Sequence, residues 1–263
     1  MASNETTRKT LLVSLVLSLV CSVLVSASAV YLGPRQQENK VLDVQRNILA
    51  ISGLVEHPEF MDREFVQEKF QAITPRLVDI RTGHYDTSGN DPVRYDQRTA
   101  ARDPARSRSL PPAADAAKIR RQAHLAQIYE VREQGELKTL ILPIHGYGLW
   151  STLYGYIALE SDLTEVAGLG FYEHGETPGL GGEVDNPRWK ELWEGKRVFN
   201  DQGRVDISVI KGAVDANSPR ALHQVDGLSG ATLTSRGVNN LVQFWLGDEG
   251  FGPFLANLKE GKA

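Results

Sequence analysis

The residues with the clearest chemical potential form one run near the C-terminus, which reads Asp226-Gly-Leu-Ser-Gly-Ala-Thr-Leu-Thr-Ser235. Two glycines and four hydroxyl residues stand directly before a segment whose apolar residues recur at helical spacing, from Val238 to Trp245. Such a backbone can present amide N–H groups and the positive end of a helix dipole to an anion, and phosphate suits that position. The simpler alternative is a turn in which a serine or threonine only caps the helix.

The same run has a second chemical reading, because Gly227 to Ala231 approximates the nucleophile elbow of a serine hydrolase. The run lacks the closing glycine of that motif. These hydrolases also place the histidine of the triad after the serine, and no histidine follows His223 in this chain. We therefore reject Ser229 as a hydrolytic nucleophile.

Two more glycine-rich runs precede this one, His174-Gly-Glu-Thr-Pro-Gly-Leu-Gly181 and Gly146-Tyr-Gly-Leu-Trp-Ser151. The glycine and proline content of the first of these runs predicts a shaped loop rather than a helix or strand. His174 either contacts a ligand or is a hydrogen-bonded loop residue, and Trp150 either stacks on a ligand or fills the core. A metal site is not predicted, since only two ligands are local and no H-E-x-x-H pattern exists. Neither run fits a dinucleotide or Walker motif.

The run from Asp226 to Thr232 resembles the flavinylation motif of FMN-binding domains in the C subunit of the sodium-translocating NADH:quinone reductase and in the related Rnf complex. The resemblance implies one FMN per chain, joined through a phosphoester to Thr232 by a dedicated flavin transferase that uses FAD and magnesium. It also implies that recognition and phosphate binding fall to Asp226, Ser229, Gly230, Ala231 and Thr234. The isoalloxazine ring is then expected against His174, Glu176, Thr177, Gly179, Leu180 and Trp150.

A polar segment from Tyr95 to Pro104 looks like one that is characteristic of the quinone-reductase family, whereas the Rnf flavin subunit is generally shorter. The resemblance thus favours an electron-transfer subunit of a sodium-pumping NADH:quinone oxidoreductase, with the other subunits of that complex as partners. Because no run fits the Rossmann pattern, electrons are expected to arrive from a partner's cofactor. The alternatives are the Rnf-type flavin subunit and an anchored module that binds a phosphate-bearing ligand noncovalently.

An uncharged run from Thr10 to Leu32 predicts a transmembrane helix after a tail of residues 1–9. A bilayer core of about 30 Å needs about 20 such residues. Ala27-Ser-Ala29 would suit cleavage of a signal peptide, but the apolar part of a signal is typically about 7–15 residues. Gly33 and Pro34 are expected to end the helix. The resemblance implies a single-pass protein of the bacterial inner membrane with its large domain in the periplasm, and the flanking charges do not fix that orientation.

The remaining chain predicts an α+β fold, an FMN-binding domain with an antiparallel or mixed sheet and flanking helices. Residues 33–80 are predicted to be a helical lead-in with a second helix after Asp62, residues 81–117 a polar insertion, and residues 118–263 the FMN-binding domain. Helices are also predicted from Arg188 to Trp193 and after Thr234. Strands are predicted over 125–131, 137–142, 153–159 and 205–210, and short spacing makes the first pairs antiparallel hairpins.

Composition excludes several functions. The chain has 29 basic and 33 acidic residues, well mixed along its length, and a formal net charge of -4, so no basic face predicts nucleic-acid binding. Its single cysteine, Cys21, cannot form an intrachain disulfide or a paired-cysteine metal site. Membrane lipid is the expected neighbour of the N-terminal segment.

Overall fold

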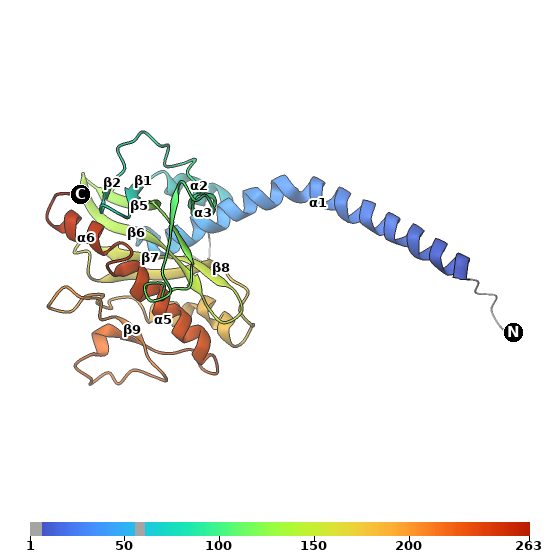
Figure 1. Ribbon diagram of the computed structural model, residues 1–263. Coiled ribbons are helices and arrows are strands. Elements are labelled where there is room, and N and C mark those ends of the chain that lie inside the picture. Colours follow the sequence, from blue (N-terminus) through green and yellow to red (C-terminus); the bar gives the residue numbers. More distant parts are fainter. Residues whose placement is uncertain (1–6, 56–60) are drawn as a thin grey trace. The chain divides into compact units, whose positions relative to one another are not determined.

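The computed structural model describes residues 7–55 and 61–263 (Figure 1). The chain divides into two compact units, Met1–Val44 and Gln45–Ala263. Helix α1 spans Thr7–Ile51. Its part up to Val44 is the described part of the first unit, and its last turns belong to the second unit. Within the described residues it is the one helix long and apolar enough to cross a membrane, by length and composition. Its apolar side chains, including Leu15 and Leu24, are exposed, as a segment in contact with lipid requires.

The predicted end of the apolar helix at Gly33 and Pro34 is wrong. Helix α1 continues through Pro34 to Ile51. Proline removes one backbone hydrogen bond and crowds the preceding turn, which can bend a helix without ending it. The predicted helix between Gln37 and Gly53 is therefore the continuation of α1 rather than a separate element.

The second unit contains a six-stranded sheet in the order β2-β1-β5-β6-β7-β8, and all its neighbouring strands are antiparallel. The predicted hairpins over 125–159 are confirmed. Its longest strands are central and buried on both faces, which explains their nearly continuous apolar sequence. The strands are β1 (Ile73–Asp79), β2 (His84–Tyr85), β5 (Leu125–Glu133), β6 (Glu136–Tyr147), β7 (Thr152–Glu160) and β8 (Val166–Glu173).

The lead-in predicted as helical is partly a strand. Helix α2 (Arg63–Phe70) begins as predicted after Asp62, whose carboxylate accepts a hydrogen bond from Phe65 N at 2.8 Å. The prediction fails beyond it, because β1 pairs along its whole length with β5. This strand buries Leu77 and Val78 in succession, so it lacks the alternation by which a strand is recognised.

The insertion predicted as a loop over 81–117 contains short regular elements. They are β2, α3 (Gln97–Arg102) and β3 (Ser107–Ser109), and β3 pairs antiparallel with β4 (Arg121–Ala123). Side-chain hydrogen bonds to the main sheet hold this segment, including one from Gln127 Nε2 to Pro92 O at 2.7 Å. Such long-range contacts can order a polar segment that has no apolar periodicity.

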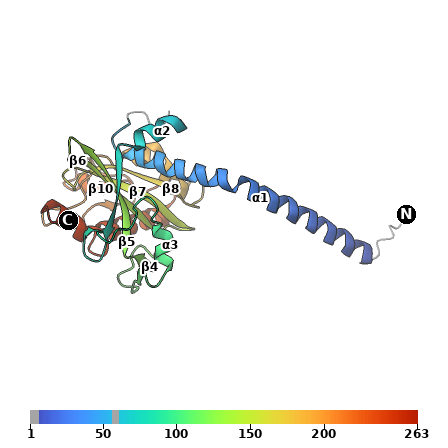
Figure 2. The same ribbon diagram turned by 90° about the horizontal axis from the view of Figure 1, so that it is seen from above.

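The C-terminal part supplies short elements and two helices (Figures 1 and 2). The strand predicted over 205–210 is only two residues long, and the helix predicted after Thr234 begins earlier, at Thr232. The elements are η2 (Gly181–Asp185), α4 (Pro187–Glu191), β9 (Ser208–Val209), η3 (Ala221–His223), β10 (Gln224–Val225), α5 (Thr232–Leu246) and α6 (Gly252–Lys259).

Helix α5 crosses one face of the main sheet and closes the core (Figure 1). Its predicted apolar face is confirmed, since Val238, Leu241 and Trp245 are buried. The approach to β6 is close, because a Cβ on Gly146 would lie 2.6 Å from the Leu241 Cβ. The last turns of α1 cover β8, where a Cβ on Gly168 would lie 3.0 Å from the Ile51 Cβ. Helix α5 is thereby fixed with its N-terminus beyond the end of β6.

Candidate flavin site

The run from Asp226 to Ser235 forms a turn that leads directly into α5. Gly230 has φ +72°, a conformation that favours glycine, and Ala231 stands at the N-cap position. Ala231 makes no side-chain capping hydrogen bond, so the first amide groups of α5 are not satisfied by a cap. The helix therefore offers N–H donors and its positive dipole end beside Thr232, its first residue.

The four hydroxyl groups of this run fall into two pairs. Ser229 and Thr232 are exposed, whereas Thr234 and Ser235 are buried. Thr234 Oγ1 donates to Glu176 Oε2 at 2.7 Å. Ser235 Oγ accepts from the N–H of Leu228 at 2.9 Å and donates to a backbone carbonyl. Only the first pair is accessible to a reagent or a modifying enzyme.

Glu176 joins all three glycine-rich runs. Its side chain is buried, with 5% of the residue exposed. Oε1 accepts hydrogen bonds from the backbone N–H groups of Leu149, Trp150 and Ser151 at 3.1, 3.0 and 3.2 Å, while Oε2 accepts from Thr234. Burial raises the pKa of the Glu176 carboxyl, but these hydrogen bonds outweigh burial and leave the pKa lowered. The ionised carboxylate thus ties the three runs together through internal hydrogen bonds.

Two glycines make this tie possible. A Cβ on Gly148 would lie 2.7 Å from Glu176 Oε1. One on Gly181 would lie 2.5 Å from Thr234 Oγ1 and 2.8 Å from Glu176 Oε2. Since any larger residue would displace the buried carboxylate, the glycines of the runs serve close packing as well as loop shape.

His174 has both ring nitrogens engaged inside its own loop. Nε2 lies 2.7 Å from Asp185 Oδ2, and Nδ1 accepts from the backbone N–H of Glu176 at 3.2 Å. An accepting Nδ1 places the proton of a neutral ring on Nε2, which then donates to Asp185. His174 is therefore a hydrogen-bonded loop residue, and its contact with a flavin stays a prediction.

The tip of the same loop is exposed. The carbonyl of Thr177 accepts from the N–H of Leu180 at 3.1 Å and of Gly182 at 2.9 Å, which closes a turn at Gly179, whose φ is +75°. Leu180 projects from this turn with 46% of the residue exposed. Its Cδ2 would lie 3.2 Å from a Cβ on Gly230, so Leu180 lies directly against the turn at Gly230.

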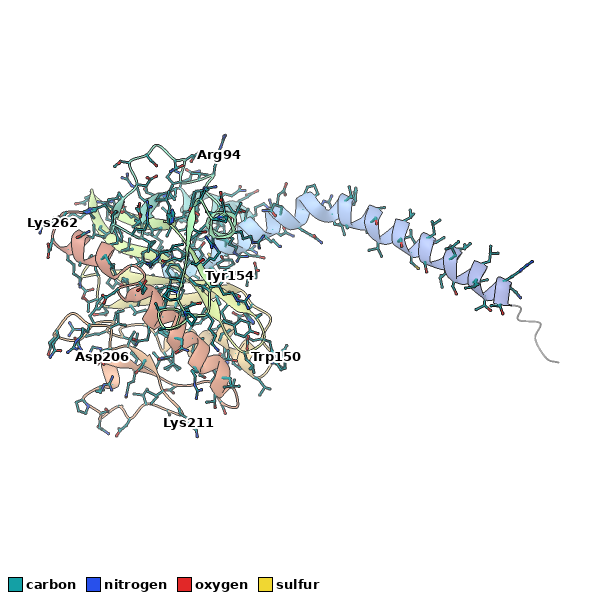
Figure 3. The ribbon with its side chains drawn as sticks, viewed as in Figure 1. Arg94, Trp150, Tyr154, Asp206, Lys211 and Lys262 are labelled. Carbon is teal, nitrogen blue, oxygen red and sulfur yellow. The ribbon has the colours of Figure 1, made fainter. Side chains whose placement is uncertain are left out.

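Other large apolar side chains are exposed around the N-terminus of α5. Trp150 is 67% exposed and projects from the surface in Figure 3, so it does not fill the core. Leu233 and Tyr147 are also exposed. Aromatic and aliphatic surface beside an uncapped helix N-terminus fits a ligand that combines a planar ring with a phosphate.

Asp226 connects the start of its run to two residues that precede it in the sequence. Its Oδ1 accepts from the N–H of Val214 at 2.9 Å, and its carbonyl accepts from Trp189 Nε1 at 2.9 Å. Sequence reasoning missed both partners, because nothing local marks a residue 12 or 37 positions away as a partner. It also missed Ser151, whose Oγ accepts from the N–H of Gly175 at 2.6 Å.

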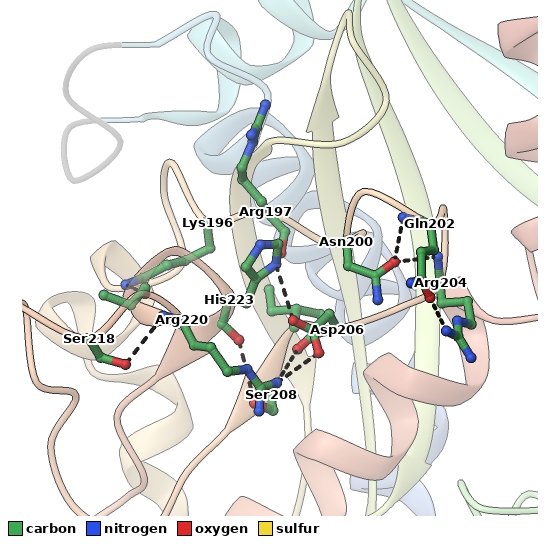
Figure 4. Close-up of polar contacts among 12 residues, drawn as sticks. Lys196, Arg197, Asn200, Gln202, Arg204, Asp206, Ser208, Ser218, Arg220 and His223 are labelled. Atoms are coloured by element: carbon green, nitrogen blue, oxygen red, sulfur yellow. Dashed lines mark hydrogen bonds and ion pairs between the residues drawn. The ribbon is translucent and has the colours of Figure 1, made fainter.

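A second group of polar contacts surrounds strand β10, which directly precedes the run from Asp226 to Ser235 (Figure 4). Arg220 Nη2 pairs with Asp206 Oδ1 at 2.7 Å. His223 Nδ1 lies 2.8 Å from the carbonyl of Arg197 and donates to it. These contacts fix the parallel pair of β9 and β10, and Asp226 follows β10 directly.

The fold and the site define an FMN-binding domain, and the family of that description matches residues 148–247. The predicted α+β fold with an N-terminal apolar helix is confirmed. The chain belongs to the NqrC family, the C subunit of the Na(+)-translocating NADH-quinone reductase. It is 55% identical to that protein from Pseudomonas aeruginosa over 263 residues, all of both chains. It is 49% identical to that from Yersinia pestis, over 98% of this chain and 96% of the relative.

Solved structures agree with this assignment. The crystal structure of NqrC from Shewanella oneidensis matches with a TM-score of 0.74 and 37% identity, over 82% of this chain and 96% of that one. The crystal structure of the same reductase component from Parabacteroides distasonis matches with a TM-score of 0.62 and 26% identity, over 83% and 94% of the two chains.

Proposed function

We propose that this chain carries FMN in a phosphoester linkage to Thr232 and relays electrons within a membrane-bound, sodium-translocating NADH-quinone reductase. The observation that carries the proposal is the position of Thr232, which is exposed and is the first residue of an uncapped helix. A phosphate attached there lies beside free N–H donors and the positive end of the helix dipole. The buried neighbours Thr234 and Ser235 have their hydroxyl groups engaged.

The residues of the three runs have distinct parts in this proposal. The first turn of α5 and the turn at Ser229 and Gly230 hold the phosphate, while Leu180 and Trp150 offer apolar surface to the ring. Glu176 and His174 hold the loops in place through the hydrogen bonds described above. Bound FMN supplies reversible uptake and release of electrons, and the protein binds and orients it.

We expect attachment to require a second enzyme, because an unactivated threonine hydroxyl is a weak nucleophile. A flavin transferase would direct the hydroxyl oxygen to the FMN-side phosphorus of FAD. The new O–P bond forms, the pyrophosphate bond breaks, AMP leaves and the hydroxyl proton is lost. Ser229, the other exposed hydroxyl, is the internal competitor for this reaction.

The proposed setting is a bacterial inner membrane, with the apolar part of α1 from Thr10 to Leu32 as the lipid-embedded anchor and the second unit in the periplasm. Partners would be the other subunits of the complex, as the names of the relatives indicate. No glycine-rich run fits a dinucleotide site. We therefore expect dithionite, but not NADH, to reduce the flavinylated chain in the absence of those subunits.

The test is intact mass of the full chain produced with and without a flavin transferase. Wild type and Ser229→Ala should gain the mass of one FMN less one water, whereas Thr232→Ala should not. Flavin lost on denaturation would instead support a noncovalent phosphate-ligand site. Peptide mapping that located the flavin on Ser229 would remove Thr232 from the proposal.

A further inference from the structure

The polar insertion contacts Glu173, the last residue of β8, which directly precedes the loop from His174 to Gly181. Its helix α3 begins at Gln97 after Asp96, whose Oδ1 accepts from the N–H groups of Arg98 at 2.9 Å and Thr99 at 3.0 Å. This cap fixes the first turn of α3. Arg98, in that turn, is the residue through which the insertion reaches the loop.

Three contacts hold the guanidinium of Arg98. Nη1 lies 2.9 Å from Glu173 Oε2 and 3.1 Å from Oε1, and Nη2 donates to the Tyr172 hydroxyl at 3.1 Å. The guanidinium carbon also lies 3.4 Å from the centre of the Tyr154 ring. The His145 ring stacks with Tyr154, with centroids 5.5 Å apart. One cation therefore joins the ends of two neighbouring strands.

The contacted strand ends are an irregular part of the sheet. Tyr154 of β7 pairs with Glu173 of β8, but the register shifts between Tyr154 and Gly155. A bulge of this kind loosens the hydrogen-bond ladder and redirects the chain that follows it. The residue that follows Glu173 is His174, so the direction of the loop is set at this point.

The insertion is itself fastened to the sheet, which allows Arg98 to act as a fixed support. Tyr95 donates through its hydroxyl to the carbonyl of Leu125 at 2.9 Å, and Gln127 Nε2 donates to Pro92 O at 2.7 Å. These bonds anchor the approach to α3. An ion pair with side chains 36% and 49% exposed contributes little alone, but the ring contact and the hydroxyl bond add to it.

We propose that Arg98 is a positioning residue for the flavin site, which holds the bulge at the end of β8 and so fixes the loop from His174 to Gly181. The proposal rests on the proposed function in one respect, the contact between that loop and the flavin ring. The proposal gives the insertion over residues 81–117 a role in the flavin site, although the two are far apart in the sequence.

The first experiment measures hydrogen exchange over the loop in the full, unflavinylated chain in detergent. Arg98→Gln should speed exchange of the amides of Gly175, Glu176 and Leu180 by on the order of fivefold to tenfold, because local opening becomes easier. Arg94→Gln is the matched control, since Arg94 lies in the same insertion, 88% exposed, and pairs only weakly with Asp91 at 3.5 Å. It should leave these amides unchanged.

The second experiment reads the flavin itself. After intact mass has shown one FMN on each variant, visible circular dichroism of the flavin should change in Arg98→Gln and not in Arg94→Gln. Glu173→Gln should reproduce both effects, and the double variant should add little to either single one. If Arg98→Gln does not fold, Glu173→Gln carries the test.

The outcomes separate the two proposals. Unchanged exchange and unchanged circular dichroism in flavinylated Arg98→Gln would overturn the role of Arg98 and leave the attachment to Thr232 intact. Faster loop exchange in a chain that never gains flavin would support the role of Arg98 on the loop while the proposed function failed.

Discussion

Glu176 shows how a single buried charge can organise a surface site. Three backbone N–H groups and one hydroxyl surround its carboxylate, so every strong interaction it makes is internal. These hydrogen bonds show a supporting role, and a contact of this side chain with the flavin ring stays a prediction. The exposed surface beside it, including Trp150 and Leu180, depends on where the carboxylate holds the backbone.

We predict that Glu176→Gln destabilises the second unit by about 2–4 kcal/mol, because an amide NH2 would face donors and the ionised acceptor would be lost. Thermal unfolding of the unflavinylated chain measures this loss. Glu191→Gln is the control, since Glu191 is exposed, and it should change the midpoint little. Equal midpoints for both variants would contradict the internal tie.

Because the imidazole of His145 is buried, we predict that the folded protein loses stability in mild acid. Burial, with a smaller contribution from Arg98, lowers the pKa of this imidazole from 6.5 to about 4. The unfolded chain therefore binds a proton between these values that the folded chain does not. Stability is complete above pH 6.5 and falls as the pH approaches 4, by at most about 3 kcal/mol.

Urea unfolding at pH 7 and pH 5 checks this prediction. His145→Gln should lose less stability between the two values than wild type does. Glu176 contributes separately at lower pH, because a lowered carboxyl pKa gives stability that is lost only as the pH falls below its unfolded value of 4.5. A wild-type slope that His145→Gln retained in full would assign the effect to other groups.

At the scale of elements, the junction between the loop and α5 allows no added atom at Gly181. We predict that Gly181→Ala costs about 1–3 kcal/mol and lowers the yield of flavinylation, because its Cβ would displace Thr234 and Glu176. Thermal midpoint and intact mass measure the two effects. Gly175→Ala is matched within the same loop, since its Cβ would meet only Ser151 at 3.4 Å.

Elements with local signals were predictable. The hairpins of β5, β6 and β7 follow from strand-like runs at short spacing, and α2 follows from Asp62 as a cap. Strand β1 was not predictable, because it contains Pro75 and buries successive residues, and its pairing with β5 and β2 makes it a strand. The first turn of α5 is held by two bonds that no local pattern marks: Leu228 N–H donates to Ser235 Oγ, and Thr234 Oγ1 donates to Glu176 Oε2.

The candidate site was predictable as three runs but not as an arrangement. Motif resemblance located His174, Glu176 and Thr232 without showing that Glu176 joins Thr234 over 58 residues of sequence. Arg98 had no signal of its own. Its partner Glu173 lies 75 residues away, and only the folded sheet brings the two together.

At the scale of the whole chain, the second unit contains the sheet and its core. We predict that a chain lacking residues 1–34 is soluble without detergent and folds, since the apolar span of about 20 residues is what commits the chain to a bilayer. Size-exclusion chromatography and circular dichroism measure this. If the complete chain is expressed and the mature protein begins after Ala29, the segment is a signal peptide instead.

The division of the four hydroxyl groups into exposed and buried pairs bears on the order of maturation. An unfolded chain would present all four to a modifying enzyme alike, whereas the folded chain withholds Thr234 through Glu176 and Ser235 through Leu228. Under the proposed covalent attachment, the fold would therefore select the acceptor before any flavin is added. We therefore expect a free peptide spanning residues 226–235 to be labelled poorly and without selectivity. A flavin at Thr232 would then show that the chain had folded before it was modified.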